Sequence, residues 1–230
     1  EAATDSEFLR RVAYDLVGIP PTVEELQAFR ADKNPAKRER IIDRLMARPE
    51  FVDHWALKRG DLLQENRTRL GDKGMWAFRE WIRESLATNK PYDKMARELI
   101  TARGSTFQNP PANFFRFTRD PKVAMETTTQ LFLGVRMVCA QCHDHPFERW
   151  TQNQYYEMGA YFAQVGFKRG QVGKEVIFQE AGGSFQITAE EIVYNRYDGG
   201  EVKHIKTDAV VAPHVPVGDA KTTRAGADRR

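Results

Sequence analysis

The two cysteines of this 230-residue chain lie next to a histidine in the run Cys139-Ala140-Gln141-Cys142-His143. Two thiols three residues apart project from one helical turn, so both can bond to the same edge of one flat molecule. The next residue, already fixed by that turn, then presents an imidazole to the centre of that molecule. This C-x-x-C-H spacing is typical of covalent attachment of a c-type haem, with the histidine on the iron.

Three other interpretations of this run stay open at the level of sequence. The cysteines are core residues beside an incidental histidine, or they form a thioredoxin-like dithiol, although such a dithiol normally follows a strand. A zinc site formed by Cys139, Cys142, His143 and His145 has ligands of the right kind. It would place all four within one short segment, whereas structural zinc sites usually take a second pair from a distant segment.

His143 is the predicted proximal ligand of the iron, and the sequence does not choose the sixth ligand. The candidates are Met158, Met137, Met125, His54, His204 and His214. Each methionine lies in an apolar helical stripe, where core packing is the more common role. We expect His145 to be a surface or supporting imidazole rather than a ligand. Arg136 and Arg149 flank the motif and have the forked shape that pairs with haem propionates, but solvated arginines explain them equally well.

Aromatic residues follow the motif closely and supply surface that would suit a porphyrin. They are Phe147, Trp150, Tyr155, Tyr156, Tyr161 and Phe162. An aromatic stripe is more often ordinary core, and we favour core packing for this set.

The elements that must position the motif are predicted to be mainly helices. Apolar periodicity and capping residues predict helices over 8–16, from Thr22, from Asn34-Pro35 to Pro49, over 51–66, 76–86 and 92–102. The segment 104–117 is expected to be an ordered loop whose phenylalanines pack inward. Asp120-Pro121 is predicted to begin the longest helix, which would run to about Val138 and lead into the motif.

The pattern changes after Val165, where short strands are predicted. Lys174 to Phe178 and Ser184 to Thr188 flank the Gly182-Gly183 turn. Ile192 to Tyr197 and Val202 to Lys206 flank Asp198-Gly199-Gly200, which indicates a hairpin. The predicted fold is therefore a mainly α, multi-helix domain around the C-x-x-C-H site, with a small C-terminal β-hairpin appendage. We divide it into a helical domain over 1–165, a β-rich extension over 166–217, and a disordered linker or chain end over 218–230.

Bulk composition favours a core-forming protein that binds neither nucleic acid nor a membrane through a span of its own. Apolar residues make up 41% and charged residues 29% of the chain, and the net charge is only +3. No stretch approaches the roughly 18 apolar residues of a membrane helix. The chain begins without a signal peptide or a methionine, so we expect a fragment or a processed form of a larger protein.

Three segments of the sequence resemble a planctomycete cytochrome-type domain found in large secreted proteins. The main one begins at the motif and continues through Asp144-His145-Pro146-Phe147 and Tyr155-Tyr156 to Ala160-Tyr161-Phe162. The others are Arg10-Arg11-Val12-Ala13-Tyr14-Asp15-Leu16-Val17-Gly18-Ile19-Pro20-Pro21-Thr22 and Trp81-Ile82 through Asn89-Lys90-Pro91-Tyr92-Asp93. The resemblance covers roughly residues 5 to 165, and the part after Val165 has no counterpart in it.

The resemblance implies a cytochrome, with Cys139, Cys142 and His143 as its haem-binding residues, rather than a defined reaction. We therefore expect one haem c and electron transfer with a redox partner protein or a neighbouring domain, in the bacterial periplasm or outside the cell. A haem enzyme or ligand sensor with an open distal position is an alternative. So is a non-haem zinc or disulfide module that binds glycans or proteins. The sequence indicates no catalytic residue.

Overall fold

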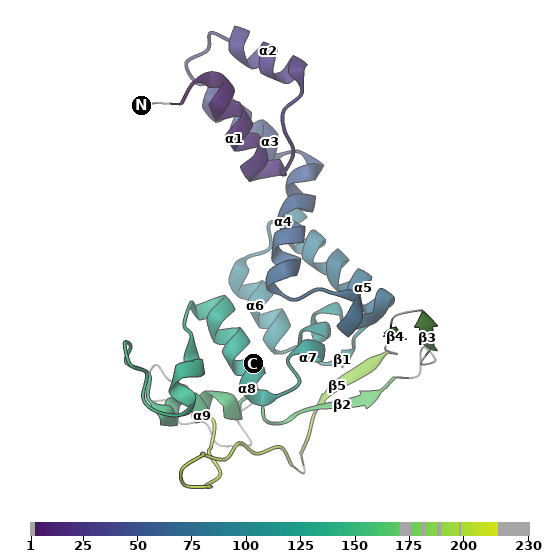
Figure 1. Cartoon of the computed structure of the whole chain (residues 1–230), viewed down its shortest axis with the longest axis vertical. Coiled ribbons are helices and arrows are strands. Elements are labelled where there is room, and N and C mark those ends of the chain that lie inside the picture. The colour runs from purple at the N-terminus through teal and green to yellow at the C-terminus, as the bar shows by residue number, and fades with distance from the viewer. Residues whose placement is uncertain (1–2, 171–175, 181–182, 188–189, 198, 216–230) are drawn as a thin grey trace. The chain divides into compact units, whose positions relative to one another are not determined.

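The computed structural model describes residues 3–170, 176–180, 183–187, 190–197 and 199–215 (Figure 1). These residues form nine α-helices and two small antiparallel sheets, which confirms a mainly helical fold with a small β part near the C-terminus. Among them, no helix is both long and apolar enough to cross a bilayer.

The chain divides into two compact units. The first consists of Glu1–Leu63 and Arg79–Lys90, and the second of Gln64–Phe78 and Pro91–Arg230. The domain boundaries expected at 165 and 217 stay predictions. The expected linker over 218–230 lies outside the described residues.

The first unit is built from helices whose starts are encoded locally. α1 (Asp5–Val17) and α2 (Val23–Ala31) both begin with a capping box, formed by Thr4 with Glu7 and by Thr22 with Glu25. In each box the threonine hydroxyl and the glutamate carboxylate satisfy backbone N–H groups that the first helical turn leaves unpaired. This confirms the helix start predicted at Thr22.

Two predicted boundaries in the first unit were wrong by a few residues. α3 (Lys37–Met46) begins after Ala36, because the Asn34 side chain accepts the Ala36 N–H in a turn instead of capping the helix. Pro49, predicted to end this helix, is the first residue of α4 (Pro49–Leu62). Proline suits that position because the first N–H of a helix has no partner within the helix.

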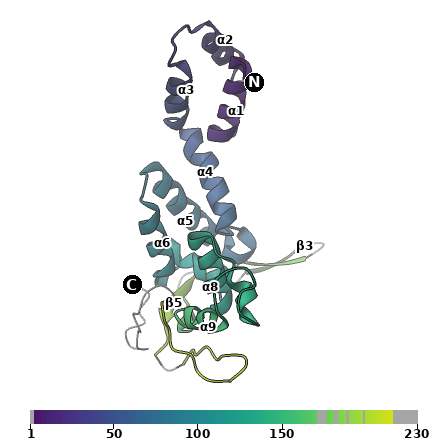
Figure 2. The ribbon, with the colours of Figure 1, turned by 90° about the vertical axis from the view of Figure 1, so that its left-hand side faces the viewer.

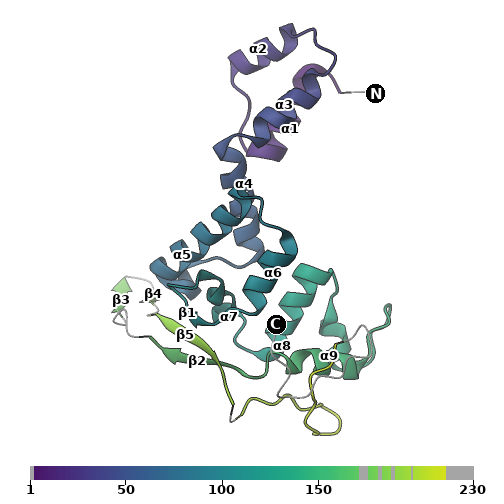
Figure 3. The same ribbon diagram turned by 180° about the vertical axis from the view of Figure 1, so that it is seen from behind.

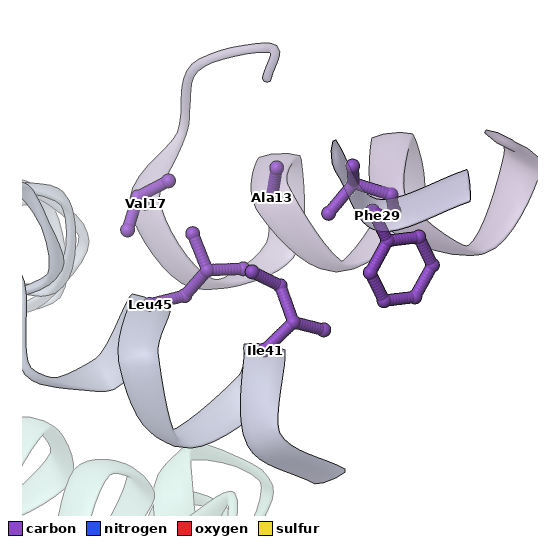
Figure 4. Close-up of a cluster of buried hydrophobic side chains, with 6 residues drawn as sticks. Ala13, Val17, Phe29, Ile41 and Leu45 are labelled. Carbon is purple, nitrogen blue, oxygen red and sulfur yellow. The ribbon is translucent and has the colours of Figure 1, made fainter. Parts of the chain in front are cut away.

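α1, α2 and α3 lie together in the first unit (Figure 2), and apolar side chains from them meet in one cluster (Figure 4). Its buried members are Leu9, Ala13, Val17, Phe29, Ile41 and Leu45. Burying each of the larger side chains contributes about 1.5–3 kcal/mol, which outweighs the weak intrinsic stability of such short helices.

The second unit contains the first part of α5 (Arg67–Ala87), and the rest of this helix, from Arg79, belongs to the first unit. α5 is interrupted at Gly71 by a left-handed φ of 66°. The sequence predicted a break between helices over 51–66 and 76–86, and helical residues lie on both sides of Gly71. α6 (Tyr92–Ile100) follows. The segment predicted as a loop holds the two-residue strand β1 (Gly104–Ser105), a 3-10 helix (Pro110–Asn113) and α7 (Phe114–Phe117). Its phenylalanines Phe114, Phe115 and Phe117 are buried, as predicted.

The strands of the second unit pair differently from the sequence prediction (Figure 3). β3 (Val176–Glu180) and β4 (Gly183–Ile187) form the first predicted hairpin. The second predicted hairpin is wrong. β5 (Glu191–Asn195) lies between β1 and β2 (Val165–Arg169), and the stretch 202–206 makes only an isolated bridge, Lys203 with Val210. The buried Arg116 guanidinium helps to fix β5, because its Nε lies 3.1 Å from the Glu191 carboxylate.

The turn after α1 yields a stability prediction. Gly18 ends the helix with a φ of 74°, and a Cβ there would collide with the imidazole of His54 on α4. We expect Gly18→Ala to lower the free energy of unfolding by at least about 2 kcal/mol, because left-handed strain and the collision add. In a His54→Ala background the same change is expected to cost only about 1 kcal/mol. Urea denaturation of the four proteins measures this coupling, and equal costs in both backgrounds would refute the collision.

Candidate functional site

The C-x-x-C-H motif lies in the connection between α8 (Pro121–Thr128) and α9 (Gln152–Ala160), which loops outward in Figure 1. The continuous helix predicted to reach Val138 was wrong. A π-helical turn follows α8 over Thr129–Leu133 and ends at Gly134, whose φ is 67°. The hydroxyls of Thr128 and Thr129 bond to the backbone carbonyls of Ala124 and Glu126, a competition that weakens and bends helices.

Both thiols are held near the end of one short 3-10 helix, Met137–Gln141. Cys139 lies within it and Cys142 is the residue that caps it, so the predicted single turn has 3-10 geometry. Residues i and i+3 eclipse in a 3-10 helix, which places the two thiols on the same side. Both cysteines are free; Cys139 is half-buried and Cys142 is exposed.

The imidazole of His143 is exposed and has one hydrogen-bond contact, from Nδ1 to the carbonyl oxygen of Asp144 at 2.6 Å. A carbonyl oxygen only accepts, so Nδ1 carries the proton and donates it. In the neutral imidazole, Nε2 is then the nitrogen that carries the lone pair.

Two side chains of α9 donate hydrogen bonds to the backbone of the motif. The Gln141 carbonyl accepts hydrogen bonds from the Tyr156 hydroxyl at 3.0 Å and from the Gln152 amide at 2.9 Å. The Asp144 carboxylate accepts the backbone N–H of Gln152 at 2.8 Å. Tyr155 and Tyr156 are fully buried. The roles of Gln141 and Gln152 could not be predicted from the sequence, because their hydrogen bonds join segments that only the tertiary fold brings together.

The loop after the motif is organised by His145. Its Nδ1 accepts hydrogen bonds from the backbone N–H groups of Phe147 at 3.3 Å and Glu148 at 3.1 Å. The backbone N–H of His145 donates to the Trp150 carbonyl. The Trp150 indole donates to the Glu148 carboxylate at 2.8 Å. His145 thus holds the turn from Phe147 to Trp150, and its expected role beside a haem stays a prediction.

The aromatic residues after the motif divide into two groups. Trp150, Tyr155, Tyr156 and Phe162 are buried, and Tyr161 is half-buried, as expected for core. Phe147 instead has 92% of its surface exposed. Arg136 and Arg149 are both exposed, and Arg149 lies over the Trp150 ring. Neither arginine forms an ion pair within the described part of the chain.

The candidates for a sixth ligand are scattered. Met125 and Met137 are core residues, Met158 is half-buried on α9, and His54 belongs to the first unit. His204 packs against the Tyr156 ring at 4.8 Å, and His214 lies 3.6 Å from the Glu157 carboxylate. Over the described ranges, no three His, Cys, Asp or Glu side chains are close enough together to hold a metal ion.

Comparison with known proteins identifies the class to which this chain belongs. Residues 1–166 match the model of PSCyt2, a family described as a protein of unknown function (DUF1549). Because the match spans well over half of the sequence, the chain is a member of the PSCyt2 family. No curated protein and no solved structure matches it. The segment from 167 onward, which includes β3, β4 and β5, lies outside the family match.

The role of His145 is open to a direct test. His145→Ala removes the acceptor for two backbone N–H groups, so we expect the amides of Phe147 and Glu148 to exchange about fivefold faster, corresponding to about 1 kcal/mol. His145→Asn keeps an acceptor near the position of Nδ1 and should preserve most of the protection. Hydrogen exchange measured by NMR or mass spectrometry distinguishes them. Equal exchange in wild type and His145→Ala would contradict the role.

The buried Tyr155 predicts a loss of stability at high pH. Burial, together with the hydrogen bond from its hydroxyl to the Glu126 carboxylate, raises the pKa of this phenol above its usual value of 10.0. The stabilisation is complete below the unfolded-state pKa and is lost as the pH rises above about 10. We expect the urea midpoint of the wild type to fall more steeply between about pH 9 and 11 than that of Tyr155→Phe. Parallel slopes would show that this phenol does not contribute.

Proposed function

We propose that the second unit carries one haem c, bound covalently through Cys139 and Cys142 with His143 on the iron, and transfers electrons. The observation that carries the proposal is the orientation of His143. The Asp144 carbonyl fixes the proton on Nδ1, which leaves the lone pair of an exposed Nε2 available to the iron. Metal-binding histidines are commonly oriented through such a bond from the other ring nitrogen.

The state of the cysteines also supports haem attachment. Each thiol would add across a vinyl C=C bond of the porphyrin, with sulfur bonding to one carbon and hydrogen to the other. This addition consumes no oxidant or reductant, but it requires two reduced, accessible thiols, and both cysteines are free with Cys142 exposed. The sulfur atoms end on the porphyrin edge rather than on the iron. The motif therefore does not need to gather three ligands around one ion.

Among the possible haem activities, electron transfer requires the fewest specific roles of the surrounding residues. When bound, haem supplies a one-electron iron couple, and the protein supplies its attachment, orientation and surroundings. Cys139, Cys142 and His143 perform the first two tasks, and we assign no catalytic residue. The proposed partner is a redox protein or a neighbouring domain of a larger exported protein. Because haem c is attached outside the bacterial cytoplasm, we propose a periplasmic or extracellular location.

The proposal predicts a covalent chromophore. Expressed in a host that has the haem-attachment machinery, the chain should show a c-type α-band after dithionite reduction. A pyridine haemochrome should survive acid–acetone extraction. Cys139→Ser and Cys142→Ser should each leave one vinyl group conjugated and move the haemochrome band to longer wavelength, and the double variant should lose its haem on extraction. His145→Asn, outside the attachment set, should retain covalent haem.

Other outcomes would favour the alternatives. A spectrum that changes on adding cyanide or carbon monoxide would move the assignment from electron transfer to a haem enzyme or ligand sensor. A colourless chain from the same host would refute haem binding. Bound zinc or a Cys139–Cys142 disulfide in that chain would favour a non-haem module that binds glycans or proteins.

A further inference from the structure

Three large apolar side chains are exposed in the connection between α8 and α9. Phe147 has 92% of its surface exposed, Leu133 57% and Val138 44%. A phenylalanine with almost all of its surface in water stabilises the fold little and is free to contact another molecule. These three lie before, within and after the segment that presents the two thiols.

Phe147 is exposed even though its loop is ordered. On one side of it, His145 accepts its backbone N–H and that of Glu148. On the other, the buried Trp150 donates to the Glu148 carboxylate and accepts from the backbone of His145. Burying a phenylalanine ring stabilises a fold, and this loop holds the ring where folding does not gain that stabilisation.

The 3-10 helix of the motif separates an inner side from an outer side. Met137 and Ala140, three residues apart, are buried, whereas Val138 and Cys142 are exposed. His143 continues on the exposed side. The thiol row is separate from the buried row of Met137 and Ala140 and adjoins the row of Val138, so an object bonded to the thiols would lie beside the exposed Val138. Phe147 follows His143 by four residues, a reach of at most about 14 Å, which is comparable with the width of a porphyrin.

We propose that Phe147, together with Val138 and Leu133, forms the apolar surface that packs against the haem and shields it from water. This inference rests on the proposed function and adds residues outside the C-x-x-C-H motif to the cofactor site. The occupant is the porphyrin rather than a partner protein, because bonds to Cys139 and Cys142 would fix it beside these side chains.

The test compares Phe147→Ala with Phe147→Leu and with Tyr197→Ala, since Tyr197 is a second aromatic with 92% exposure and lies after β5. In the haem-free chain the Phe147 ring makes little contact, so all three variants should keep the wild-type urea midpoint. In the haem-loaded chain, Phe147→Ala should lower the midpoint potential, because water would stabilise the more highly charged ferric state. Phe147→Leu should fall between, and Tyr197→Ala should match wild type.

Each outcome separates this inference from the proposed function. If the wild type carries covalent haem while Phe147→Ala has an unchanged midpoint potential, the proposed function stands and the apolar haem-packing surface is refuted. If Phe147→Ala already destabilises the haem-free chain, Phe147 is a structural residue and the inference fails. A wild-type chain without haem refutes the proposed function itself, and with it the apolar haem-packing surface.

Discussion

The geometry of the motif depends on one backbone carbonyl, that of Gln141, and on the two α9 side chains that bind it. The last carbonyls of a helix have no partner within the helix, and a 3-10 helix of five residues has little stability of its own. Tyr156 and Gln152 supply the missing donors from a helix that is anchored by the buried tyrosine pair. Because α9 is held by hydrophobic burial, its hydrogen bonds to Gln141 fix the orientation of Cys139, Cys142 and His143.

The same connection separates residues that stabilise the fold from residues that remain available for chemistry. Tyr155, Tyr156 and Trp150 are buried, and their polar atoms bond to Glu126, Gln141 and Glu148. Their hydrogen-bonding capacity is used within the protein. Cys142, Nε2 of His143 and the ring of Phe147 lie outside that network and are exposed. An ordered support beneath an accessible set of residues is the arrangement expected of a preorganised site.

The sequence was most informative where structure is determined by neighbouring residues. The α2 start at Thr22, the first helix over 8–16 and the C-x-x-C-H motif are local patterns that the sequence shows. The end of α8 was missed because hydroxyl-to-carbonyl bonds from Thr128 and Thr129 outweighed apolar periodicity. The hairpin predicted over 192–206 does not form, because β5 pairs with β1 and β2 and Glu191 forms an ion pair with Arg116. The hydrogen bonds of Tyr156 and Gln152 to Gln141 could not be predicted, since Gln141 lies more than ten residues away.

The position of the cysteines also bears on the dithiol alternative. Reactive cysteine pairs of the thioredoxin type have a thiolate at a helix N-terminus, where unpaired N–H groups and the positive end of the helix dipole stabilise its charge. Here Cys142 lies at the C-terminal end of its short helix, where the backbone carbonyl groups point. The carbonyl of Gln141 accepts a hydrogen bond from the Tyr156 hydroxyl. The motif therefore lacks the helix N-terminus on which the dithiol alternative depends. The proposed thioether attachment needs no such terminus, because a thioether carries no charge.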